Sequence, residues 1–240
     1  MADTHAIATG HSTGHSSEHP PQLRHHFDDM HQQFDSATFG MWVFLLTEIM
    51  FFGGMFGAYT VYRSMYPEAF AATSNFMNPA FGAANTAVLI VSSLTMALAV
   101  RAAHLGQQKF LQLMLVLTMI FGTAFLVIKG FEYHEHWVDM KVPLFPGHWA
   151  WDGPLAPPQY AHQAQILFCF YFFMTGFHAV HMVVGLGIMT TILLMARKGS
   201  FGPAYYTPVE VSGLYWHFVD IVWIFLFPLL YLIGHTKNLI

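Results

Sequence analysis

The segment FGMWVFLLTEIMFFGGMFGAYTVY, from Phe39 to Tyr62, carries a single charged side chain, Glu48, in 24 residues. At about 1.5 Å per residue, a helix of this length crosses the roughly 30 Å hydrocarbon core of a bilayer. Glu48 would then lie about 14 Å deep, where an ionised carboxylate costs on the order of 3 kcal/mol. Glu48 should therefore face protein or internal water, either as a satisfied structural carboxyl or as a functional group.

The composition extends this reading to the whole chain. Charged side chains make up 9% of the 240 residues and apolar ones 55%, whereas soluble domains carry about 25% charge. Four more stretches are apolar enough to span a bilayer, namely residues 83–100, 110–128, 164–196 and 211–233, and only the last contains a charge, Asp220. The sequence predicts an all-α integral membrane bundle of five transmembrane helices. The nine Lys and Arg are scattered, so no basic stripe for nucleic acid is expected.

The N-terminal 36 residues differ from the rest. They contain seven of the sixteen histidines among Ser, Thr, Gly, Pro and Asp, with no apolar periodicity: His5, His11, His15, His19, His25, His26 and His31. We expect residues 1–36 to be a disordered His-rich tail and residues 37–240 to form the five-helix transmembrane domain. The histidine spacing matches no closed set of metal ligands, so we expect no specific metal site.

Several polar side chains fall within or beside the apolar spans. We predict that Glu48, His178, His181, His217 and Asp220 form or border an interior polar network, with a structural or a proton-related role. Nearby, Gly53 and Gly57 form a Gly-x-x-x-Gly pair, which predicts close approach of another helix.

Other polar residues are predicted to lie at helix ends. Lys129 and Glu132 follow the third apolar span, where charge is typical of the bilayer surface, and Glu210 precedes the fifth. Arg101 and Arg197 end the second and fourth spans and are candidates for lipid phosphate groups. With the N-terminus inside, the inner segments hold five Lys and Arg and the outer ones four, while the most acidic loop faces out. We therefore expect a cytoplasmic N-terminus.

Two other functions fit parts of this pattern. His178 or His181 on one helix and His217 on another could supply the two axial ligands of a membrane haem-binding electron-transfer protein. Asp220 follows His217 one turn later, which favours a hydrogen-bond network over haem ligation. Glu48 and Asp220 at similar depth would suit an ion carrier, although no inverted repeat is visible. Both alternatives remain open at this point.

Five ordered segments resemble subunit III of the haem-copper terminal oxidases. They are WVFLLTEIMFFGGMF (42–56), PAFGAANTAVLIVSSLTM (79–96), KGFEY (129–133), TGFHAVHMVVG (175–185) and VEVSGLYWHFVDIVWIFLF (209–227). The resemblance runs from about Phe39 to the C-terminus. Members with seven helices have two before the helix that carries the acid, so this chain is similar to the shorter five-helix bacterial form.

The resemblance implies an accessory subunit of a proton-pumping oxidase that binds no metal or haem itself. It implies contact with catalytic subunit I, which carries haem and copper, and with other oxidase subunits, and it implies bound structural phospholipid. Glu48 matches the family's carbodiimide-reactive carboxyl, which implies a role in proton uptake and in protection from turnover inactivation. The implied location is the bacterial inner membrane, and either cytochrome c or quinol is compatible as electron donor.

Overall fold

The computed structural model describes residues 27–145, 147–152 and 157–233, and throughout these ranges the chain is built from helices and connecting loops. Five helices are long and apolar enough to cross a membrane. They are α1 (Met30–Met65), α3 (Pro79–His104), α4 (Gln108–Val138), α5 (Ala161–Arg197) and α6 (Thr207–Tyr231). The predicted all-α class and the five predicted spans are therefore confirmed.

The start of α1 lies inside the segment assigned above to the tail. Asp29 caps the helix by accepting a hydrogen bond from the Gln32 backbone N–H at 2.6 Å, and the helix begins at Met30. His31 lies on this helix, with its Nδ1 3.0 Å from Asp35 Oδ2 one turn later. The other six tail histidines lie outside the described residues.

A short helix, α2 (Pro67–Ser74), lies between α1 and α3. Pro67 stands in its first turn, where a missing N–H costs nothing, and Asn78 caps the following helix α3. Phe70 is fully buried, and α2 packs against α5. With only 8 residues, α2 is too short to produce a periodic apolar signal in the sequence.

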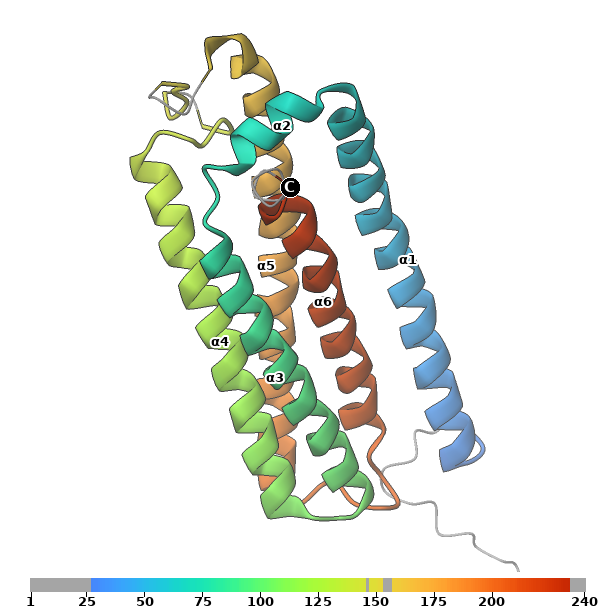
Figure 1. The fold of residues 1–240 in the computed structure, drawn as a ribbon. Helices are drawn as coiled ribbons and strands as arrows, with labels where there is room; N and C mark the ends of the chain where they lie inside the picture. Colours follow the sequence, from blue (N-terminus) through green and yellow to red (C-terminus); the bar gives the residue numbers. More distant parts are fainter. Residues whose placement is uncertain (1–26, 146, 153–156, 234–240) are drawn as a thin grey trace, which may run out of the picture.

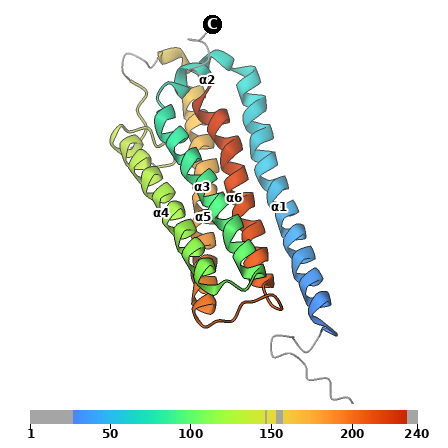
Figure 2. The same ribbon diagram turned by 60° about the horizontal axis from the view of Figure 1, so that its bottom comes forward.

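The long helices are arranged around α6, which contacts α1, α3 and α5 (Figure 1). Helix α1 joins this group along a narrow seam, because only Leu45, Phe52 and Tyr59, each seven residues apart, are buried on it. Tyr59 Oη donates a hydrogen bond to the Leu229 carbonyl of α6 and closes one end of this seam. Two views show α1 running beside α6 at the edge of the bundle (Figures 1 and 2).

The two ends of the bundle differ. The start of α1, the α3–α4 turn and the α5–α6 connection lie at one end, and α2 with the α4–α5 loop lies at the other (Figure 1). Lys141 anchors that loop, because its buried Nζ donates to the Ala150 carbonyl at 2.6 Å and lies 3.4 Å from Asp152 Oδ1. Because α1 and α6 both start at the first of these two ends, they run in the same direction, and Glu48 and Asp220 lie on parallel helices.

Helices pack closely around Trp216 of α6. A Cβ added at Gly122 of α4 would lie 2.7 Å from the Trp216 ring, and one added at Gly185 of α5 would lie 2.8 Å from it. Trp216 Nε1 donates to Ser92 Oγ of α3 at 3.0 Å. The ring of this α6 residue therefore contacts α3, α4 and α5.

Gly53 and Gly57 do not take part in such packing. A Cβ added at either position would meet no atom of the described chain within 4 Å. The expectation that they pack against another helix is therefore wrong within this chain. Contact with another subunit at these glycines stays a prediction.

Candidate functional site

Glu48 of α1 faces His181 of α5, with Oε2 3.2 Å from Nε2. The Nδ1 atom of His181 lies 2.8 Å from the Phe177 carbonyl, which can only accept, so Nδ1 carries a proton and donates. The opposite ring nitrogen is then either an acceptor for protonated Glu48 or the second donor of an imidazolium to a carboxylate. In both states one proton is shared between the two side chains. Glu48 therefore faces protein, as expected from its depth.

The surroundings of this pair are apolar but not closed. The side chains of Glu48 and His181 are 19% and 16% exposed, at a groove of about 350 Å³ lined by α1, α5 and α6. Tyr215 of α6 donates from its Oη to the His181 carbonyl at 3.0 Å. A proton held here is in reach of a molecule or a helix that lies against the outer face of the bundle.

His217 and Asp220 form a second, separate cluster with Ser93 of α3. The Nδ1 atom of His217 lies 2.7 Å from Ser93 Oγ, and all three side chains line one cavity between α3 and α6. The two α6 residues share a face, as their spacing predicted. They line a different cavity from the one that contains the Glu48–His181 pair.

His178 stands apart from both clusters. It is buried between the rings of Phe125 and Trp223, and within the described chain neither of its ring nitrogens has a hydrogen-bond partner. The five residues predicted as one interior network thus occupy three separate places. His178 and His217 also line no common cavity in the described ranges, which disfavours them as a pair of axial haem ligands.

Lys129 and Glu132 of α4 are buried between helices, several residues before α4 ends at Val138. Their side chains are 5% and 2% exposed, and Lys129 Nζ lies 2.9 Å from Glu132 Oε2. Lys129 also donates to Tyr171 Oη at 3.1 Å and to Tyr231 Oη at 2.6 Å, so all three ammonium protons have acceptors. Tyr231 Oη in turn donates to Glu132 Oε1 at 2.6 Å. This buried cluster joins α4, α5 and α6.

The sequence spacing of Lys129 and Glu132 could have indicated that the two side chains form a pair. A lysine and a glutamate three positions apart share one helix face, and a pair next to an apolar span can turn inward together. The two tyrosines come from 42 and 102 positions away, and no local pattern connects them to Lys129.

At the opposite end of the bundle, Glu210 lies in the first turn of α6, and its Oε2 lies 3.2 Å from His104 Nε2 of α3. Glu210 thus lies at a helix end as predicted. Arg101 and Arg197 are exposed in the last turns of α3 and α5 at this same end. The ring of His104 lies 3.9 Å from that of Tyr206 between centroids, so aromatic and charged groups gather where these helices leave the apolar region.

Five long apolar helices, with polar side chains gathered in small clusters between them, define a multi-pass membrane protein. The family model for cytochrome c oxidase subunit III matches residues 160–235. The cytochrome c oxidase subunit 3 of Corynebacterium diphtheriae is 32% identical over 199 residues, which cover 82% of this chain and 88% of that protein. The quinol oxidase subunit 3 of Bacillus subtilis is 28% identical and covers 81% of this chain and 86% of its own length.

The chain therefore belongs to the subunit III family of the haem-copper oxidases. Members of this family are non-catalytic subunits, so the chain is an accessory subunit of a terminal oxidase that associates with other oxidase subunits in the membrane. The resemblance read from the sequence motifs is confirmed.

Proposed function

We propose that this subunit lies against catalytic subunit I of a bacterial respiratory oxidase and sustains its proton uptake through Glu48. The supporting observation is the mostly buried Glu48–His181 pair, in which one proton is shared within the apolar span of α1. The haem and copper chemistry belongs to the partner subunit. We place the protein in the inner membrane with a cytoplasmic N-terminus, so that Glu210, Arg101 and Arg197 lie on the cytoplasmic side.

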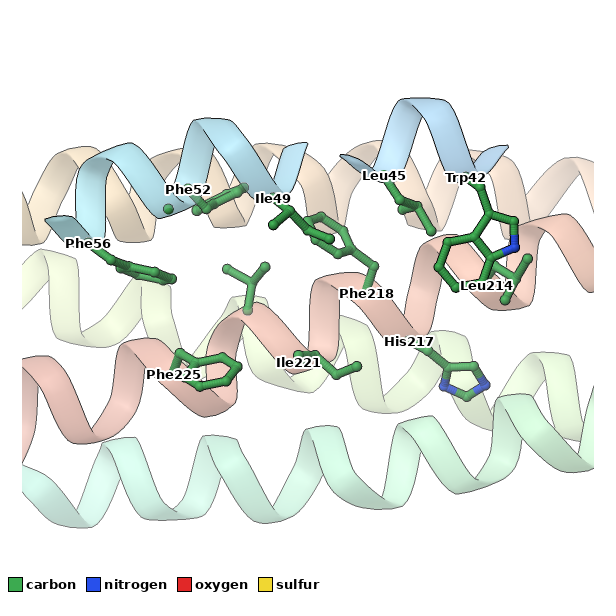
Figure 3. A pocket seen from close by; sticks show the side chains of 12 residues that line it. Trp42, Leu45, Ile49, Phe52, Phe56, Leu214, His217, Phe218, Ile221 and Phe225 are labelled. Atoms are coloured by element: carbon green, nitrogen blue, oxygen red, sulfur yellow. The ribbon is translucent and has the colours of Figure 1, made fainter. Parts of the chain in front are cut away.

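Structural phospholipid is the second part of the proposal. An apolar cavity of about 480 Å³ lies between α1 and α6, with Trp42 near one end and Phe56 and Phe225 near the other (Figure 3). Its lining matches the chemistry of an acyl chain. The exposed Arg101 and Arg197 are suited to phosphate groups at the surface on the cytoplasmic side.

Replacing Glu48 with Gln tests the proton role. The amide keeps the size and polarity of the side chain but cannot exchange a proton with His181. Initial oxygen consumption should stay nearly unchanged, because the oxygen chemistry lies in another subunit, whereas the working life of the oxidase should shorten, most strongly at high pH. The measurement is oxygen consumption followed to inactivation at two pH values, with subunit content checked by gel.

The matched control is Glu135→Gln, which neutralises an exposed carboxyl near the end of α4. It should behave as the wild type at both pH values. If the Glu48→Gln and wild-type inactivation curves superimpose, Glu48 is a packing residue and the proposed role is wrong.

A further inference from the structure

A polar notch opens on the outer face of the bundle between α3 and α6. Its volume is about 280 Å³. Its floor contains Ser93, His217 and Asp220, and its rim contains four apolar side chains that are 45–60% exposed: Ile90, Leu94, Ile221 and Ile224. The notch therefore combines an apolar rim suited to the membrane interior with hydrogen-bonding groups at its base.

Asp220, at the bottom of the notch, is an unusual residue for the middle of an apolar helix. Asp220 lies about halfway along the 25-residue helix α6, and the residue is 2% exposed. Within the described chain, the donor beside this carboxyl group is the Ser93 hydroxyl, whose contact with it lacks ordinary hydrogen-bond geometry, and no Lys or Arg lines the notch. A buried carboxyl without a well-formed hydrogen bond costs free energy, and the cost falls when a well-placed donor reaches it. The chain thus presents an acceptor at the depth of the bilayer interior.

The membrane offers few groups that could complete this site. Lipid headgroups lie at the surface, and acyl chains have no hydrogen-bond donors. A polar side chain on a neighbouring transmembrane helix can supply the donor, and such contacts hold helices together in bilayers. The rim also has the right form, because Ile90 and Leu94 lie four positions apart on α3 and Ile221 and Ile224 three apart on α6. These pairs form two parallel ridges that can hold a helix between them.

We propose that this notch is the docking site for a transmembrane helix of another oxidase subunit, which inserts one hydrogen-bond-donating side chain against Asp220. The volume of the notch suits a single polar side chain, and the rim residues pack against the backbone of the incoming helix. This assignment rests on the proposed function, since that function supplies the partner subunits. In this docking site His217 has a structural role, because it holds Ser93 by a hydrogen bond and shapes the wall of the notch.

The first test is photo-crosslinking in the assembled oxidase with a photoreactive amino acid at Leu94. The control places the same group at Ile120, an exposed apolar residue of α4 on another face. We expect Leu94 to crosslink to a transmembrane segment of an oxidase subunit. Crosslinks from Leu94 to lipid alone would overturn the docking site. If oxidase subunits co-purify normally in that case, the proposed function stands, whereas a wild-type chain that recovers no oxidase subunit overturns both.

The second test compares Asp220→Leu with Asp220→Asn in the full chain. Asp220→Leu removes the acceptor, so the amount of partner subunit recovered in mild detergent should fall by roughly 3- to 15-fold, the range of one interhelical hydrogen bond. Asp220→Asn keeps an acceptor oxygen and should recover most of the association. The thermal stability of the purified subunit should be unchanged or raised in Asp220→Leu. An equal loss of subunit stability and of association would mean that Asp220 only supports the fold, which would overturn the docking site.

Discussion

Lys129→Met is expected to lower the free energy of unfolding by about 3–5 kcal/mol, the usual effect of removing one partner from a buried ion pair. The methionine fills most of the space of the lysine stem but leaves Glu132 buried without its cation. It also removes the donor to Tyr171 and Tyr231, which come from two other helices. The measurement is equilibrium unfolding of the purified subunit in mixed detergent micelles.

Two further variants separate the charge from the packing. Lys129→Met combined with Glu132→Leu removes both charges, and we expect it to regain most of the lost stability, because no unpaired ion then remains in the interior. Lys109→Met replaces an exposed lysine of the same helix and should change stability by less than about 0.5 kcal/mol. A single Lys129→Met variant as stable as Lys109→Met would show that the cluster contributes nothing to the fold.

Gly122→Ala is expected to destabilise the bundle by about 1–3 kcal/mol, the range for overpacking of a well-filled core. The new methyl group would lie 2.7 Å from one atom of the Trp216 ring and 2.9 Å from another. The ring has little room to move, because Gly185 packs against other atoms of the same ring and Ser92 Oγ accepts a hydrogen bond from its Nε1. The unfolding free energy in detergent is again the quantity to measure.

Gly130→Ala is the matched control on the same helix. An added Cβ at Gly130 meets no atom within 4 Å, so the alanine should stabilise α4 by up to about 1 kcal/mol through its higher helix propensity. The two substitutions are chemically identical and should have opposite signs. Equal effects at the two positions would contradict the role assigned to the Trp216 contact.

The sequence predicted those features that depend on the bilayer itself. A membrane interior selects long uncharged helices, so composition alone located the five spans. The family-specific motifs around Glu48 and Asp220 then identified the subunit. Both results follow from patterns that are continuous along the chain.

Features that depend on contacts between distant segments were missed. Lys129 and Glu132 were taken for surface groups because charges after an apolar span usually lie there, and only the tyrosines of α5 and α6 make an interior site for them. The glycines of α1 matched a packing motif, yet close contacts occur at glycines of other helices, among them Gly122 and Gly185 beside Trp216. Likewise, the partner of Glu48 could not be chosen among several histidines without the helix arrangement, which brings His181 to it.

Purification of the tagged chain from its native membrane in mild detergent tests the central claim most directly. We expect a complex that contains this chain and the haem-bearing subunit in equal amounts, with oxygen-consuming activity. After dissociation, the haem absorbance should remain with the partner subunit. Recovery of this chain without any oxidase subunit, or with one haem retained per chain after dissociation, would contradict the assignment as an accessory oxidase subunit.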